Sequence, residues 1–176
     1  MDSAALRALV RDVPDFPEPG VDFKDITTLL ADATGFAASI DALSAPFVDA
    51  AVDLVVGVEA RGFFFSAPVA QRLGAGLVPI RKPGKLPSDT HSVRYALEYG
   101  EGSLEVHVGS IAPGDRCLIV DDVLATGGTA AASRELVELQ GGIAVGYAFL
   151  IELAFLPGRA RLGSDVPIHS LIVYEA

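Results

Sequence analysis

The sequence predicts an α/β fold: an open, mainly parallel sheet flanked by helices. Short apolar runs of strand length alternate with segments of helical length through the middle of the chain. These runs are apolar at almost every position, which is typical of parallel strands that helices cover on both faces. The composition agrees, because 51% of the residues are hydrophobic, and abundant Ala, Val and Gly let layers of sheet and helix approach closely.

The expected elements follow in order along the chain. Residues 1–12 have the spacing of a short amphipathic helix behind Ser3, and the proline-rich stretch 14–20 excludes regular structure. Residues 21–30 resume the apolar pattern around two charges expected to be exposed, Lys24 and Asp25. Helices are expected at 34–51, 63–73 and 128–140. Buried strands are expected at 54–58, 77–80, 117–121, 143–151 and 168–173.

Between the second and third of these strands the pattern changes. Residues 81–92 are polar and basic, with interspersed proline and glycine, so we expect a mobile loop there. Residues 93–97 and 104–108 alternate apolar and polar positions around a glycine-containing turn, which indicates a hairpin with one solvated face. The length of 176 residues suits a single domain with one core, over residues 1–176.

Charge and composition exclude several classes of function. Thirteen basic residues against 23 acidic ones give a net charge of −10, which argues against binding nucleic acid. No leader pattern and no apolar run of about 18 residues occurs, so we expect a cytoplasmic protein without membrane contact. Cys117, the only cysteine, lies in an apolar run and is expected to be a buried, inert thiol. The three histidines lack metal-ligand spacing.

An acidic pair, a glycine-rich turn and a helix follow the strand at 117–121. Asp121 and Asp122 come where this strand is expected to end. The turn after them contains Ala125, Thr126, Gly127, Gly128 and Thr129. Such a turn aims backbone N–H groups and the positive end of a helix dipole at one point, and its glycines let the main chain approach an anion. The unit therefore predicts a phosphate site at the carboxyl edge of the sheet, with carboxylates for ribose hydroxyls or hydrated Mg²⁺.

Other phosphate motifs do not match. No G-x-x-x-x-G-K-[ST] segment is present, which excludes a P-loop. Residues 141–146 (GGIAVG) lack the dinucleotide-binding spacing and precede a strand instead of following one. A response-regulator receiver carries its acidic pair near the start of the domain, whereas this pair begins at position 121.

The segment 120–129 resembles the signature with which type I phosphoribosyltransferases bind 5-phosphoribosyl 1-pyrophosphate (PRPP). Further segments resemble, in the same order, the corresponding stretches of adenine phosphoribosyltransferases. They are PDFPEPGVDFKDITTLL (14–30), GVEARGFFF (57–65), IRKPGKLP (80–87), YALEYG (95–100) and IEL (151–153). The PRPP signature is shared across the superfamily, whereas segments 14–30 and 95–100 point to adenine. The resemblance implies the type I fold, with a small hood over about residues 1–30 and a mobile loop and hairpin over about residues 81–108.

The resemblance also implies an activity: transfer of ribose 5-phosphate from PRPP to adenine, giving AMP and pyrophosphate. Mg²⁺ is the implied cofactor, carried on PRPP and held through water by Asp121 or Asp122. A homodimer is the implied assembly. Arg61, behind Glu59 and Ala60, matches the arginine of the family's pyrophosphate-binding loop.

Other matched residues receive roles in the same way. The family's basic loop, part of which reaches a neighbouring subunit's active site, is matched by Arg81, Lys82 and Lys85. On the hairpin, Glu98 matches the proposed acid/base residue, and the adjacent Tyr99 is assigned to the PRPP site. The implied catalytic set is Glu98, Arg61, Asp121 and Asp122.

Adenine recognition is implied at both ends of the chain. Phe23 matches the aromatic residue that stacks on adenine, and Leu153 matches the residue that closes the other face. Backbone groups around Asp22 and Lys24 would read the edge of the base. Two positions depart from the family pattern: lysine replaces an arginine at position 24, and aspartate stands at 22, where an apolar residue is frequent.

Two alternatives stay open at this point. One is a phosphoribosyltransferase for hypoxanthine, guanine or xanthine, which a comparison of those bases with adenine would distinguish. The other is a regulatory domain that senses PRPP without chemistry. Such proteins typically carry a DNA-binding segment, and both the length and the net charge of −10 argue against one here.

Overall fold

A computed structural model describes residues 1–96 and 101–175 and confirms the α/β class. Five strands, all parallel, form the central sheet in the order β4-β3-β7-β8-β9. They are β3 (Leu54–Val58), β4 (Gly76–Ile80), β7 (Arg116–Leu124), β8 (Ile143–Leu153) and β9 (Ile168–Tyr174). Each was expected from its apolar run, although most begin or end a few residues from the predicted limits.

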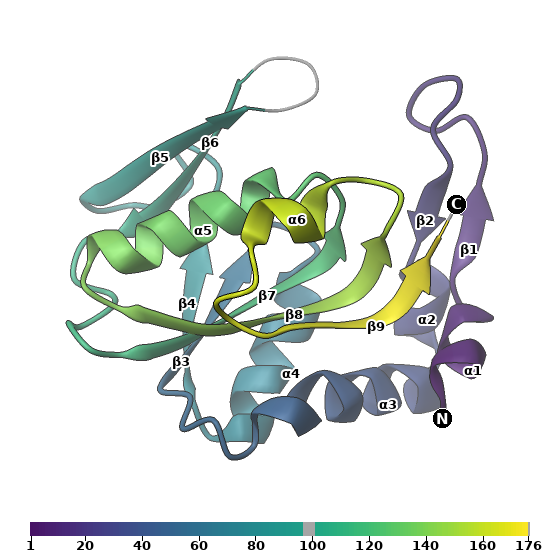
Figure 1. The fold of residues 1–176 in the computed structure, drawn as a ribbon, viewed down its shortest axis with the longest axis horizontal. Coiled ribbons are helices and arrows are strands. Elements are labelled where there is room, and N and C mark those ends of the chain that lie inside the picture. Colours follow the sequence, from purple (N-terminus) through teal and green to yellow (C-terminus); the bar gives the residue numbers. More distant parts are fainter. Residues whose placement is uncertain (97–100, 176) are drawn as a thin grey trace.

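Helices cover both faces of this sheet, as the doubly buried strands require (Figure 1). One face carries α5 (Gly128–Leu139) and α6 (Gly158–Leu162). The other carries α3 (Ala33–Ser44) and α4 (Phe63–Leu73), together with α1 (Ser3–Arg7) and α2 (Thr27–Ala31). The helix at 63–73 ends as predicted, at Gly74, which adopts the left-handed conformation with φ 68°.

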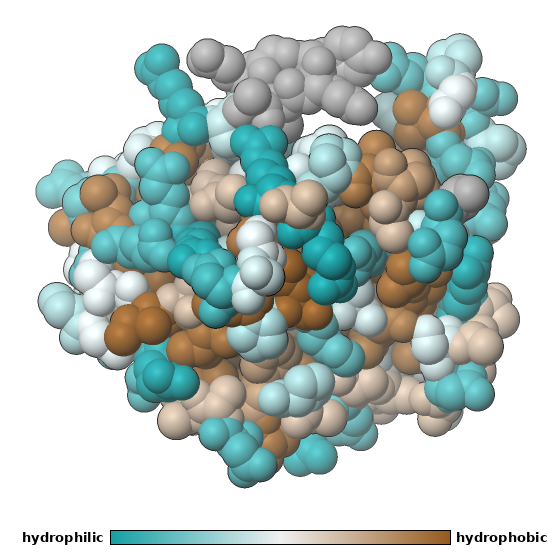
Figure 2. Space-filling model, in the orientation of Figure 1, coloured by the Kyte–Doolittle hydropathy of each residue, from teal (hydrophilic) through white to brown (hydrophobic). Residues whose placement is uncertain are grey.

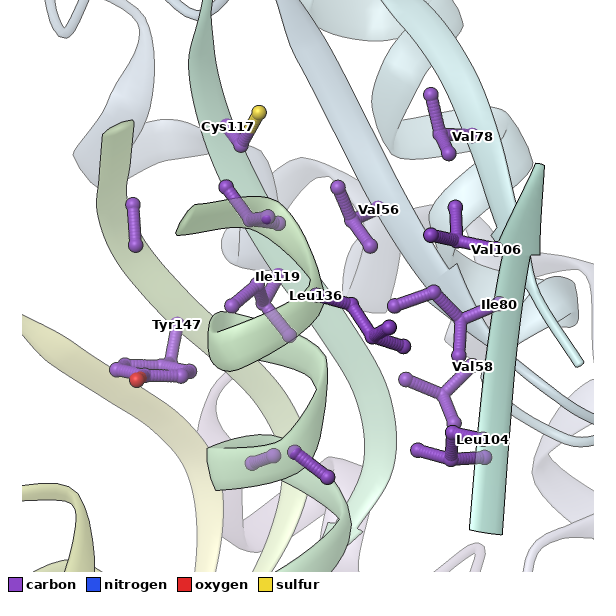
Figure 3. Packing of buried hydrophobic residues seen from close by; sticks show 14 of the residues in the cluster. Val56, Val58, Val78, Ile80, Leu104, Val106, Cys117, Ile119, Leu136 and Tyr147 are labelled. Carbon is purple, nitrogen blue, oxygen red and sulfur yellow. The ribbon is translucent and has the colours of Figure 1, made fainter. Parts of the chain in front are cut away.

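Neighbouring residues of each strand pack into opposite core layers. In β7, Cys117 and Ile119 pack toward α5, whereas Leu118 and Val120 pack toward α3 and α4, and all four are fully buried. Figure 3 shows the first layer, with Leu136 of α5 pointing toward the strands. Cys117 is fully buried, as expected, and this burial raises the pKa of its thiol to about 12.

Two antiparallel pairs stand outside the central sheet. The expected hairpin is present as β5 (Thr90–Ala96) and β6 (Glu101–His107), and Val93, Leu104 and Val106 anchor it to the core beneath α5. A second pair, β1 (Arg11–Val13) and β2 (Phe23–Asp25), lies near the N-terminus. Figure 1 shows the two pairs rising on either side of the edge where β7, β8 and β9 end.

Several boundaries differ from the predictions. The helix expected within residues 1–12 ends at Arg7, and residues 11–13 form β1 instead. The helix expected over 34–51 ends at Ser44 and passes into a 3-10 turn, Ala45–Phe47, because Pro46 has no N–H to continue the helical ladder. Residues 90–92 belong to β5 and not to the preceding loop. β7 runs through the acidic pair to Leu124, so Asp121 and Asp122 lie inside the strand and not at its end.

The N-terminal charges were also wrongly expected to be exposed. Lys24 and Asp25 are partly buried, because Lys24 pairs with Asp12 and Asp25 pairs with Arg11 across the β1–β2 ladder. Over the outer face seen in Figure 2, polar and apolar side chains are interspersed. Among the helices that the structure describes, none has the length and apolar character needed to cross a membrane.

Candidate active site

A cavity of about 930 Å³ opens at the carboxyl edge of the sheet, between the β1–β2 pair and the β5–β6 hairpin. Its walls come from the β2 region, the turn after β3, the loop after β4, the β5–β6 hairpin, the end of β7, the start of α5 and the end of β8. The sequence-predicted residues that line it are Asp22, Phe23, Lys24, Glu59, Ala60, Arg61, Lys82, Asp121, Asp122, Ala125, Thr129 and Leu153. Segments far apart in the sequence therefore meet where the topology of the sheet predicts a ligand site.

The acidic pair forms the floor of this cavity. Both carboxylates are buried, and the Asp122 N–H donates to Asp121 Oδ1 over 2.9 Å. Arg61 Nε donates to Asp122 Oδ2 in an ion pair. Burial, followed by repulsion from Asp122, raises the pKa of Asp121 well above its ordinary value. Gly62 allows the turn after β3 to lie against this pair, since a Cβ there would sit 2.6 Å from Asp121 Oδ1.

The turn between β7 and α5 presents an uncapped helix N-terminus. Gly127 is the N-cap residue, in the left-handed conformation with φ 75°, and no side chain caps the helix. The first N–H groups of α5 therefore lack a side-chain acceptor, which suits an anion. Ala125 and Thr129 line the cavity, whereas Thr126, Gly127 and Gly128 complete the turn without lining it.

Phe23 and Leu153 line the cavity from opposite ends of the chain. The Phe23 ring packs edge-on against Phe16, with centroids 5.2 Å apart, and the Arg61 guanidinium lies 5.3 Å from its centroid. Lys24, the next residue on β2, projects to the other face of the strand. Its Nζ lies 2.8 Å from Asp12 Oδ1, so its side chain is engaged away from Phe23.

The basic loop is tied to the turn after β3. Arg81 Nε donates to Glu59 Oε2 over 2.8 Å, and the Lys82 N–H donates to the same oxygen over 2.9 Å. These hydrogen bonds hold the pKa of Glu59 below its usual value, and the one from Arg81 has the largest effect. Of the three predicted basic residues, the structure brings Lys82 to the cavity but not Arg81 or Lys85. Glu98 and Tyr99 lie outside the described residues.

The hairpin also brings in residues that the sequence did not indicate. Arg94, Tyr95 and Ser103 line the cavity. The Tyr95 hydroxyl lies 3.4 Å from Thr129 Oγ1, and its ring covers Gly102. The alternating pattern predicted the hairpin, but which of its faces turns toward α5 depends on how it docks.

Comparisons with known proteins agree with this geometry. The model of the phosphoribosyl transferase domain matches residues 22–158. An adenine phosphoribosyltransferase of Cyanothece sp. is 56% identical over 169 residues, which cover 96% of this chain and 99% of the relative. The crystal structure of the adenine phosphoribosyltransferase of Rhodothermus marinus superposes with a TM-score of 0.93 at 50% identity and covers 98% of each chain.

A more distant structure was determined with ligands. The Saccharomyces cerevisiae adenine phosphoribosyltransferase, in complex with an imino-altritol bisphosphate and adenine, has a TM-score of 0.90 at 37% identity. It covers 97% of this chain and 98% of its own. The domain match and the near-full-length identity together place this chain in the adenine phosphoribosyltransferase family.

Proposed function

We propose that this protein transfers ribose 5-phosphate from PRPP to adenine, giving AMP and pyrophosphate in purine salvage. The observation that carries the proposal is the meeting, in one cavity, of the uncapped start of α5, the buried Asp121–Asp122 pair and the Phe23 ring. A helix start suits an anion, the two carboxylates suit ribose hydroxyls, and the Phe23 ring offers a flat apolar face to a base.

The turn at 125–129 holds the 5′-phosphate of PRPP in this proposal, with Thr126 and Thr129 as hydroxyl donors. Asp121 and Asp122 hold the ribose. Arg61 leaves its ion pair with Asp122 to meet the pyrophosphate, together with Lys82. Holding two substrates in alignment can lower a reaction barrier by about 7–11 kcal/mol.

Mg²⁺ fits this site only as a partly hydrated ion. Among the described residues, no group of three or more His, Cys, Asp or Glu side chains could cage a metal. Two adjacent carboxylates and a pyrophosphate suit Mg²⁺, which keeps most of its waters and binds through one or two carboxylates plus substrate phosphates. Asp121 or Asp122 would hold it through water, and the ion would supply charge neutralisation of the leaving pyrophosphate.

Phe23 and Leu153 enclose adenine in the proposed complex, while main-chain groups at Asp22 and Lys24 read its edge. The engagement of the Lys24 ammonium by Asp12 supports this assignment, because it leaves the backbone as the part of Lys24 available to the base. Glu98 is the acid/base group that exchanges a proton with the imidazole nitrogens of adenine as N9 attacks ribose C1. Tyr99 beside it belongs to the PRPP site.

The remaining sequence-based assignments form part of the same proposal. Residues 1–176 are one domain, with a hood over about residues 1–30 and a loop and hairpin over about residues 81–108. Arg81 and Lys85, which do not line this chain's cavity, belong to the loop that serves a partner's site in a homodimer. The expected cytoplasmic location stays a prediction.

Asp121→Ala combined with Asp122→Ala should abolish the formation of AMP from adenine and PRPP with Mg²⁺, while circular dichroism shows a folded protein. The variant removes the carboxylates that hold the ribose. The wild-type protein, assayed with adenine, hypoxanthine, guanine and xanthine, should use adenine. Turnover by the double variant above about a tenth of wild type, a change of less than about 1.4 kcal/mol in the barrier, would defeat the assignment.

Asp121→Asn should stabilise the protein at neutral pH and impair catalysis. The folded-state pKa of Asp121 is raised, so its ionised form costs stability above that pKa, and the cost disappears as pH falls below the ordinary aspartate pKa. The melting temperature should rise by about 2–4 °C for each kcal/mol relieved. The gain should shrink in acid. A melting temperature at pH 7 equal to or below that of wild type would contradict this assignment of the buried charge.

Glu98→Gln should lower kcat by about 10²-fold, because the amide cannot exchange a proton with adenine. KM for PRPP should change little. Glu105→Gln, on β6 of the same hairpin, serves as the matched control for loss of one carboxylate. An unchanged kcat in Glu98→Gln would reduce Glu98 to a loop residue without a chemical role.

A homodimer should appear in light scattering as a mass twice that of one chain. Arg81→Ala and Lys85→Ala should then raise KM for PRPP if the loop serves a partner's site. A monomeric mass in a fully active preparation would refute this arrangement.

A further inference from the structure

Two backbone segments touch behind the phosphate turn. Gly158, the first residue of α6, is buried, and a Cβ placed on it would lie 2.2 Å from the Ala125 carbonyl oxygen. A Cβ on Gly127 would in turn lie 2.7 Å from the Gly158 carbonyl oxygen. The start of α6 and the turn at 125–129 are therefore in contact with no room for a methyl group on either side.

Arg159, the next residue, fastens α6 to the sheet. Its guanidinium donates from Nε and Nη2 to the two oxygens of Glu152, over 2.7 and 2.5 Å, and from Nη1 to the Ile168 carbonyl over 3.3 Å. The Glu152 side chain is only 5% exposed, whereas that of Arg159 is 50% exposed. A buried carboxylate near the end of β8 thus holds the start of this five-residue helix through two charge-assisted hydrogen bonds.

We propose that Gly158 and Arg159 are positioning residues for PRPP: α6, held by the Arg159–Glu152 pair, sets the place of the turn at 125–129. The inference rests on the proposed function, because it assigns that turn to the 5′-phosphate. Neither residue lines the cavity, so each acts through the turn.

Leu153, which closes one face of adenine in the proposed complex, does not depend on the contact between α6 and the turn at 125–129. Leu153, although it follows Glu152, is held by its pairing with Tyr174 of β9, and the Ala154 N–H donates to the Tyr174 carbonyl over 2.8 Å. Loss of the α6 contact should therefore weaken the use of PRPP and leave the use of adenine nearly unchanged.

The variants Gly158→Ala, Arg159→Gln and Arg159→Lys test this in the full-length enzyme. Steady-state kinetics would give KM for each substrate, and calorimetry would give the dissociation constant of PRPP with Mg²⁺. Because Arg159→Gln leaves the buried Glu152 charge without its partner, the neutral pair Glu152→Gln with Arg159→Gln is measured beside it. Circular dichroism and melting temperature establish that each variant is folded.

Arg134→Gln is the matched control. Arg134 of α5 also forms a two-pronged ion pair, with Asp165 over 3.1 and 2.6 Å. Asp165 lies in the segment that joins α6 to β9. It takes no part in the contact between Gly158 and the turn. Its loss should leave both KM values as in wild type.

We expect KM and the dissociation constant for PRPP to rise by about ten-fold or more in Gly158→Ala and Arg159→Gln, since small displacements of a binding group are costly. KM for adenine should stay within about two-fold of wild type. Arg159→Lys should show a smaller loss of PRPP binding than Arg159→Gln, because lysine keeps the positive charge but cannot donate to both Glu152 oxygens as the planar guanidinium does. Unchanged PRPP constants in folded variants, equal losses for both substrates, or the same loss in Arg134→Gln would overturn the inference. An inactive wild-type protein would instead refute the proposed function.

Discussion

Asp121 and Asp122 place two carboxylates inside a strand that the sheet and its helices bury on both faces. Ionised carboxylates in such a position are unfavourable unless they gain hydrogen bonds or opposite charge. The two carboxylates are stabilised to different extents. Asp122 forms an ion pair with Arg61, whereas Asp121 accepts a hydrogen bond from one backbone N–H and has a raised pKa. The turn after β3 must come close enough for this arrangement, which explains why position 62 is a glycine. The site is therefore built around a buried carboxylate whose ionised form costs the folded protein stability.

Three cations in or beside the cleft are likewise held by carboxylates. Arg61 faces Asp122, Lys24 faces Asp12, and Arg81 faces Glu59. A protein with a net charge of −10 can thus offer a binding place to a strongly anionic ligand, because the acidic partners fix the cations in position before the ligand arrives. In the proposed function, binding exchanges one anionic partner for another, which would make selectivity depend on geometry more than on net attraction.

The sequence predicted the central sheet well, because apolar runs bounded by glycine and proline are a local signal. It placed the end of β7 wrongly, because Asp121 and Asp122 interrupt the apolar pattern although the ladder to β8 continues beyond them. It missed β1, β2, α2 and α6, which have three to five residues each and too little periodicity to detect. At the site, strand ends and glycine turns identified the floor, whereas Arg94 and Ser103 enter through the docking of the hairpin, which no local pattern encodes.

The two ends of the cleft rest on supports of different kinds. The end that we propose for phosphate lies on β7 and α5, whose residues are among the most buried in the chain, and α6 makes a close backbone contact with its turn. The end that we propose for the base depends on Phe23, which lies in a three-residue strand outside the central sheet and packs its ring against the exposed Phe16. Arg61 touches both ends, since it pairs with Asp122 and lies over the Phe23 ring. In the proposed function Arg61 leaves Asp122 for the pyrophosphate, which would also change the surroundings of the Phe23 ring and give the two substrates a direct means of affecting each other's binding.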